Sequence, residues 1–161
     1  MTIQVGDRLP QTTFRVMSAD GPAPKTTDDV FKGRKVVLIA VPGAFTPTCH
    51  RNHLPGYVTH ADAIKAKGVD AIAVTSVNDV FVMDAWAKAT DASGKVEFLA
   101  DGNGDFAKAV GLALDGSGFG LGTRSQRYSM IVDDGVVQAV NVEDAPSKAD
   151  VSGAEALLKQ L

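Results

Sequence analysis

Cysteine is almost absent from the sequence, because Cys49 is the only one among 161 residues. A single thiol excludes a disulfide within the chain and any metal cage built from several cysteines. Disulfides persist in oxidising compartments, so a lone thiol fits a reducing compartment better. We therefore expect a cytoplasmic protein without a cysteine-based metal centre.

Long apolar runs and long basic runs are lacking as well. The longest apolar stretch, 36–45, is interrupted by Pro42 and falls short of the ~18–20 residues that a membrane span needs. The first ten residues do not resemble a signal peptide, so we expect the mature chain to begin at Met1. The 16 basic and 19 acidic residues give a net charge of -3, and no Lys or Arg run could follow a phosphate backbone. These absences predict that neither a membrane nor a nucleic acid is a partner.

The composition is that of a folded domain. Hydrophobic residues make up 45% of the chain and charged residues 22%. A chain of this length buries roughly 68–70% of its unfolded surface, and it shows no repeat or low-complexity segment. The sequence predicts a single domain over residues 1–161.

The strongest strand signal is VVLIAV at 36–41, an unbroken run that suits a strand buried on both faces. After the turn that follows it, residues 46–68 are typical of a helix. Thr46 is the expected N-cap and Pro47 the first helical residue. Pro55 is expected to kink this helix one or two turns in.

The remaining segments alternate between strand and helix patterns. Asn78 and Ser152 are the expected N-caps of two of the helices. The predicted strands are 12–17, 69–74, 95–100 and the hairpin 127–132 with 136–140, and the predicted helices are a turn at 28–31, then 79–90, 105–112 and 153–161, with a Gly-rich loop at 114–126.

This order places parallel strands, joined by helical crossovers, beside an antiparallel pair at one edge. The fold class is therefore α/β. We expect a thioredoxin-like fold with an N-terminal extension, in which helices flank a central mixed sheet.

Cys49 falls at the third position of the predicted helix 46–68. Free backbone N–H groups and the positive end of the helix dipole stabilise a thiolate there. Thr46 lies one turn earlier, so its hydroxyl could share a small pocket with the sulfur. From the residues alone, an inert buried thiol beside a capping threonine stays about as probable as a reactive one.

The run PGAFTPTCHRNHLPGY at 42–57 resembles the active-site segment of peroxiredoxins, whose signature is Pro, three residues, Thr, two residues, Cys. Its wording is most similar to the type-five, or plant type-two, subfamily. Three further stretches agree in the same order, at 76–86, 120–137 and 141–143. The resemblance therefore covers most of the chain.

The resemblance implies a role for each matching residue. Cys49 would be the peroxidatic nucleophile, Thr46 would orient peroxide and sulfur, and Pro42 would shield the thiolate from water. The family's arginine matches Arg127 in QRYSMIV rather than Arg124, which we expect to be a solvated surface charge. The backbone N–H groups of Thr48 and Cys49 would help hold the distal peroxide oxygen.

The implied activity is reduction of hydrogen peroxide and organic hydroperoxides through a sulfenic acid on Cys49. Many relatives carry a second, resolving cysteine that this chain lacks, so an external thiol is required. Glutathione, with or without glutaredoxin, is the first expectation and thioredoxin the second. The resemblance implies no cofactor, and it favours a homodimer with its interface near the loop 116–123.

Other interpretations remain to be tested. The chain could be a non-catalytic thioredoxin-like module that binds partners or senses redox state, in which case Cys49 would be unreactive. Zinc bound by Cys49 with His50, His53 and His60 is disfavoured because no acidic pair completes four ligands. A Cys-His hydrolase using His53 or His60 is disfavoured because it has no need of the Pro and Thr residues that precede Cys49 in the motif. A phosphate-binding loop is disfavoured because the Gly-rich loop lacks the lysine that follows the last glycine of such loops.

Overall fold

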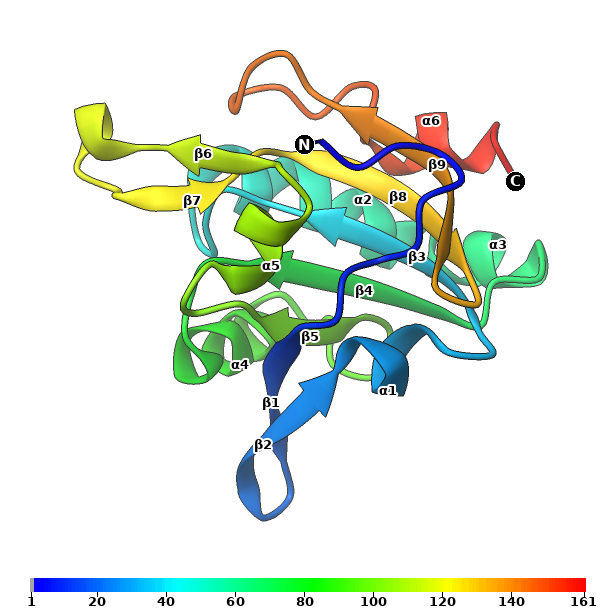
Figure 1. Cartoon of the computed structure of the whole chain (residues 1–161), viewed down its shortest axis with the longest axis horizontal. Helices are drawn as coiled ribbons and strands as arrows, with labels where there is room; N and C mark the ends of the chain where they lie inside the picture. Colours follow the sequence, from blue (N-terminus) through cyan, green and yellow to red (C-terminus); the bar gives the residue numbers. More distant parts are fainter. Residues whose placement is uncertain (1) are drawn as a thin grey trace.

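The computed structural model describes residues 2–161 and contains a seven-stranded mixed sheet (Figure 1). The sheet has the order β2-β1-β5-β4-β3-β8-β9. Its strands are β1 (Thr13–Ser18), β2 (Gly21–Thr26), β3 (Lys35–Ala40), β4 (Ala71–Ser76), β5 (Glu97–Ala100), β8 (Tyr128–Asp133) and β9 (Val136–Val142). The α/β, thioredoxin-like class with a central mixed sheet is thus confirmed.

Strand β3 lies in the interior of the sheet, as its apolar run predicts. It pairs in parallel with β4 and antiparallel with β8, and Val36 to Ala40 are all buried. Antiparallel pairs close both edges of the sheet, β8 with β9 on one side and β1 with β2 on the other. The second edge was not predicted, because Pro22 and Pro24 argue against a strand; they are tolerated in β2 because it is an edge strand.

Helices cover both faces of the sheet. They are α1 (Thr27–Phe31), α2 (Leu54–Thr59), α3 (Ala61–Ala66), α4 (Val80–Ala89), α5 (Asp105–Ala109) and α6 (Ala154–Leu158). The alternation of β3 divides the interior into two cores, with Val37 and Ile39 on one face and Val36 and Leu38 on the other. Cys49 belongs to the first core, together with residues of α2, α3, α4 and α6.

Two predicted helix caps are wrong. The side chain that caps α4 is Asp79, which accepts from the Val82 N–H, and α6 begins after Gly153. Asn78 instead accepts from the Ala44 N–H, and the Ser152 hydroxyl donates to the Glu143 carboxylate. The Gly-rich loop also contains an unpredicted hairpin of β6 (Ala113–Asp115) and β7 (Thr123–Ser125), with a 3₁₀ turn at Ser117–Phe119.

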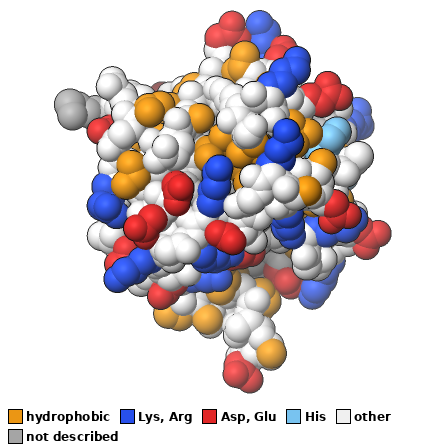
Figure 2. Space-filling view, turned by 90° about the vertical axis from the view of Figure 1, so that its right-hand side faces the viewer, with side chains coloured by type: hydrophobic (Ala, Val, Ile, Leu, Met, Phe, Trp, Pro, Cys, Tyr) orange, Lys and Arg blue, Asp and Glu red, His pale blue; other side chains and the backbone are white. Residues whose placement is uncertain are grey.

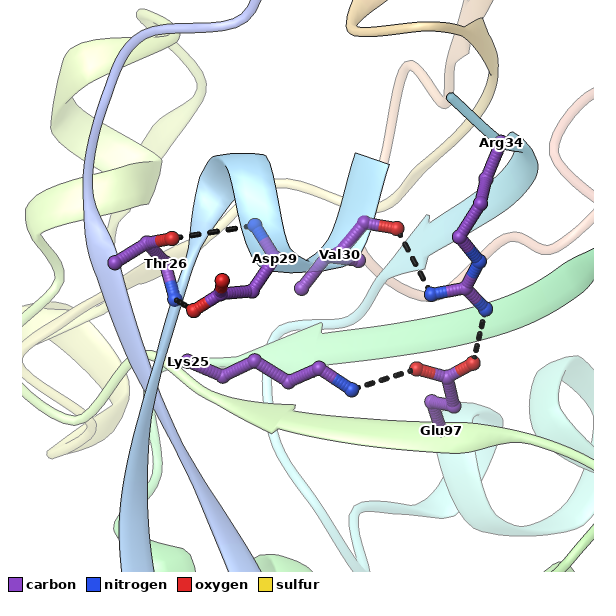
Figure 3. A network of polar contacts seen from close by, with 6 residues as sticks. All are labelled: Lys25, Thr26, Asp29, Val30, Arg34 and Glu97. Atoms are coloured by element: carbon purple, nitrogen blue, oxygen red, sulfur yellow. Dashed lines mark hydrogen bonds and ion pairs between the residues drawn. The ribbon is translucent and has the colours of Figure 1, made fainter. Parts of the chain in front are cut away.

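A polar network links β2 and α1 to Glu97 of β5, and Arg34 joins it to α1 by donating to the Val30 carbonyl (Figure 3). Thr26 and Asp29 form a capping box at the start of α1. Glu97 of β5 accepts from Lys25 at 3.2 Å and from Arg34 at 2.6 Å. Burial alone would raise the pKa of Glu97, but the hydrogen bond and charge of Arg34, together with Lys25, hold it below its usual value. This network tethers the N-terminal extension.

On the face turned toward the viewer in Figure 2, acidic and basic side chains are interspersed, with small hydrophobic patches between them. Among the helices of residues 2–161, none is long and apolar enough to cross a bilayer.

Candidate active site

The predicted helix 46–68 is divided into a π-helical segment that contains Cys49, followed by α2 and α3. Helical conformation begins at Pro47 and passes into a π-helical segment at Cys49–His53, where the Leu54 N–H donates to the Cys49 carbonyl. Pro55 has no N–H to donate one turn back, so a break in the regular ladder is expected next to it. Cys49 is the third helical residue, as predicted, and the Thr48 and Cys49 amides lie in the first turn, where a helix supplies no acceptor of its own.

Residues 43–46, here called the Thr46 turn, connect β3 to this helix. The Thr46 N–H lies 3.4 Å from the Gly43 carbonyl, and Phe45 has a left-handed φ of 64°. That conformation costs a bulky L-residue about 1–2 kcal/mol. The Thr46 hydroxyl donates to the Gly43 carbonyl at 2.7 Å, so its lone pairs are left to accept a hydrogen bond from another group.

Arg127, directly before β8, reaches the sulfur of Cys49. Its Nη2 lies 2.8 Å from Cys49 Sγ, and its Nη1 donates to His53 Nδ1 at 2.9 Å. Nε and Nη2 also donate to the Pro146 carbonyl, at 3.2 and 3.1 Å. Cys49 is fully buried and Arg127 is 2% exposed. The structure thus brings together the two residues that the sequence places 78 positions apart.

The charge of Arg127 has no carboxylate partner within the described residues. The four ion pairs of residues 2–161 lie elsewhere, and the nitrogens of Arg127 meet a neutral imidazole, a carbonyl oxygen and the sulfur. A buried cation without a counter-ion is strongly unfavourable. The contact of Nη2 with Cys49 Sγ places this charge directly beside the sulfur.

His53 holds the other side of the guanidinium. Burial, followed by the nearby charge of Arg127, lowers the pKa of His53 to about 4, against the opposing hydrogen bond of the Ser152 carbonyl. The neutral ring accepts from Arg127 at Nδ1, which assigns the proton to Nε2, where it is donated to the Ser152 carbonyl at 3.0 Å. The Tyr57 hydroxyl donates to the same carbonyl at 2.6 Å, and burial raises the pKa of Tyr57.

Glu143 is the last member of this network and contacts Ser152. Its carboxylate accepts from both the N–H and the hydroxyl of Ser152, at 2.7 and 2.6 Å. The loop between Glu143 and Ser152 therefore passes over the site, where the Ser147 carbonyl also accepts from the Thr48 hydroxyl at 3.2 Å. No local pattern predicts the role of Glu143, although the matching stretch 141–143 contains it, or the contact of His53 with Arg127, which lies 74 positions away.

Other predicted residues lie close to this cluster. Pro42 is buried directly before the Thr46 turn. Arg124 is half-buried and donates to the carbonyls of Leu121 and Val77, at 2.9 and 3.3 Å, so the expectation of a solvated surface charge is wrong.

The histidines are engaged in other contacts. His50 Nδ1 accepts from the indole of Trp86 at 3.1 Å, and the His60 ring bonds to the Gly56 carbonyl at 2.8 Å. No group of three or more His, Cys, Asp or Glu side chains arranged to hold a metal occurs within residues 2–161.

Comparison with known proteins defines the class first. Residues 4–158 match the family model described as Redoxin. The chain is 45% identical to peroxiredoxin-2C of Oryza sativa, covering 99% of this chain and 98% of that protein. It is 44% identical to the chloroplastic peroxiredoxin-2E of Arabidopsis thaliana, covering 99% of this chain and 70% of that protein.

A solved structure gives the same result. Reduced Prx3 of Vibrio vulnificus in complex with hydrogen peroxide is 52% identical, with a TM-score of 0.94 over 99% of each chain. The chain therefore belongs to the peroxiredoxins, the thiol peroxidases of the redoxin family, and within them to the type-two and type-five group as a single-cysteine member.

The network predicts a stability that falls in mild acid. The pKa of His53 is near 6.5 in the unfolded chain and about 4 in the folded protein, so between these values only the unfolded chain takes up the proton. Lowering the pH from 7 to 5 should cost roughly 2 kcal/mol of unfolding free energy through this group. In His53→Gln, whose amide keeps one acceptor and one donor, that part of the loss should disappear.

Urea unfolding at several pH values measures the slope. His60→Gln, the same change at a half-buried histidine outside the network, is the matched control for the substitution itself. Equal slopes in wild type and His53→Gln would contradict the neutral state of His53.

Proposed function

We propose that Cys49 is the peroxidatic residue and that the chain reduces hydrogen peroxide and organic hydroperoxides. The observation that carries this proposal is the 2.8 Å contact between Arg127 Nη2 and Cys49 Sγ, made by a guanidinium that takes part in no ion pair within residues 2–161. The thiolate attacks one peroxide oxygen and the O–O bond breaks. The sulfur becomes a sulfenic acid, and the other oxygen takes up a proton and leaves as water or alcohol.

The surrounding groups stabilise this step. The guanidinium of Arg127 stabilises the developing negative charge, and the amides of Thr48 and Cys49, in the first turn of the helix, help to hold the distal peroxide oxygen. Because the Thr46 hydroxyl donates a hydrogen bond to the Gly43 carbonyl, its oxygen accepts a hydrogen bond from the peroxide and so sets the direction of the peroxide. Pro42 limits access of water to the sulfur. Hydrogen peroxide, present in the similar Vibrio vulnificus structure, is the substrate we propose first.

Two substitutions test these roles. Thr46→Val keeps the shape but removes the accepting oxygen, and we expect a loss of about a hundredfold or more in the rate of peroxide reduction. Arg127→Lys replaces a planar set of donors with one ammonium group, which cannot contact Cys49, His53 and Pro146 together, and it should also lose most activity. Stopped-flow kinetics at varied peroxide concentration measure both.

Arg15→Lys is the matched control, because Arg15 is exposed on β1. It should retain wild-type rates. If Arg127→Lys were as active as Arg15→Lys, Arg127 would have no role in peroxide reduction. A wild-type Cys49 that does not react with peroxide would instead favour the non-catalytic module.

Recycling is proposed to need an external thiol. Cys49 is the only cysteine, so the sulfenic acid finds no second thiol in the same chain. Two copies of Cys49 are unsuited to pair with one another, because each sulfur is fully buried. Glutathione, with or without glutaredoxin, is the proposed reductant and thioredoxin the second candidate.

Oxidised protein mixed with glutathione should gain one glutathione per chain, since the thiol condenses with the sulfenic acid and releases water. Without a thiol, excess peroxide should carry Cys49 on to sulfinic and sulfonic acids. Intact-mass spectrometry after one equivalent of peroxide separates these products. A disulfide-linked dimer as the main product in the presence of glutathione would refute this route.

A homodimer is proposed as the assembled form. The resemblance implies a dimer interface near the loop that contains Phe119, and here Phe119 is 84% exposed at the tip of the β6–β7 hairpin. We expect Phe119→Lys to shift the mass measured by size exclusion with light scattering from two chains to one. Val5→Lys, at a 63% exposed apolar residue near the N-terminus, is the control and should leave the dimer intact. A wild-type chain that elutes as a monomer would contradict the proposal.

A further inference from the structure

The Thr46 turn is contacted by two side chains that the proposed chemistry does not use. One is Asn78, which lies in the loop between β4 and α4. Its Oδ1 accepts from the Ala44 N–H at 3.0 Å and also from the Ser76 hydroxyl. Asn78 thus fixes the middle of the turn to the carboxyl end of β4.

The second is Arg124 of β7. Its Nε donates to the Leu121 carbonyl and its Nη1 to the Val77 carbonyl, so it joins the β6–β7 hairpin to the loop that carries Asn78. The hairpin projects on the side of the sheet toward which β3 and β4 run (Figure 1). Arg124 therefore spans loops at the carboxyl ends of the parallel strands.

Gly43 shows how closely these groups approach. A Cβ atom at Gly43 would lie 3.0 Å from Thr46 Cγ2 and 3.3 Å from Arg124 Nη1. The Arg124 guanidinium and the Thr46 side chain thus both lie next to Gly43, whose carbonyl accepts a hydrogen bond from the Thr46 hydroxyl. A substitution of either side chain would therefore change the position of Gly43, whose carbonyl oxygen orients the Thr46 hydroxyl.

The turn needs such support because of its own conformation. Phe45 is held at a φ of 64°, which a bulky L-residue rarely adopts unless its surroundings impose it. Its amide neighbour Ala44 bonds to Asn78, and its ring stacks on His50 with centroids 5.6 Å apart. Contacts outside the turn therefore maintain its shape.

We propose that Asn78 and Arg124 are positioning residues of the peroxidase reaction, which clamp the Thr46 turn so that the lone pairs of the Thr46 hydroxyl face the peroxide. This role rests on the proposed function of Thr46. The clamp acts on the direction of the substrate and leaves the charge around Cys49 unchanged, because neither side chain contacts the sulfur or Arg127 in the hydrogen bonds of residues 2–161.

The test compares two reactions of the same thiol. In Asn78→Leu and Arg124→Met, we expect the rate constant of Cys49 with hydrogen peroxide to fall about tenfold to a hundredfold, since small misplacements at a reacting centre have effects of this size. Alkylation of Cys49 by iodoacetamide does not use the Thr46 hydroxyl and should stay within about twofold of wild type. Ser76→Ala, a milder change that loosens Asn78, should reduce only the peroxide rate, by a smaller factor.

Matched controls carry the same chemical changes elsewhere. Asn103→Leu lies in an exposed loop and Arg15→Met on an exposed strand position, and both should keep the wild-type rates. Thermal unfolding of each variant checks the fold. Equal losses of the peroxide and alkylation rates would show a merely structural role and overturn the clamp.

A double-mutant cycle with Thr46→Val separates the clamp from the proposed function. If the clamp acts through the hydroxyl, Asn78→Leu should cost little more once that hydroxyl is gone. Additive losses would refute the clamp while keeping Thr46 in its role. A Thr46→Val variant with wild-type activity would refute the proposed role of Thr46 itself.

Discussion

The site depends on one interaction, that of the buried Arg127 guanidinium with Cys49. Its nitrogens make four hydrogen bonds, one to a sulfur, one to a neutral imidazole and two to the same carbonyl, and none of the ion pairs within residues 2–161 includes it. Burying such a cation is tolerable only when a counter-ion is close. A second cation beside Arg127 would be unfavourable, so His53 has to stay neutral. Its Nε2 donates to the carbonyl of Ser152, which Glu143 holds, and the loop that carries Pro146 covers the site.

Two separate supports meet at the reacting sulfur. The positive charge is that of Arg127, directly before β8. It is held by His53 of the π-helical segment, which in turn donates to Ser152 in the loop before α6. In the proposed mechanism the direction of the substrate comes from the Thr46 turn, which lies between the loop after β4 and the β6–β7 hairpin. These supports share the helix that begins at Pro47, and that helix places Cys49 where they converge.

Local patterns explain which parts could be predicted from the sequence. The apolar run of β3 and the Thr-Pro start of the helix carry strong short-range signals, so the central strand and the helical position of Cys49 were predicted correctly. Asn78 and Ser152 resemble helix caps because capping residues are short and polar. Their side chains instead form hydrogen bonds with Ala44 and Glu143. Arg127 was selected by the resemblance, whereas its contact with His53 spans 74 positions and leaves no local pattern.

The neutral partner of Arg127 has a consequence for the catalytic cycle. A carboxylate beside the guanidinium would neutralise it in every state of the sulfur, whereas His53 leaves the charge to Cys49. In the proposed mechanism the sulfenic acid is uncharged, so oxidation removes the counter-ion of Arg127. The oxidised site is then the one in which an incoming thiolate gains most from the guanidinium. The same buried charge that promotes attack on peroxide therefore also favours the anionic form of the thiol that restores Cys49.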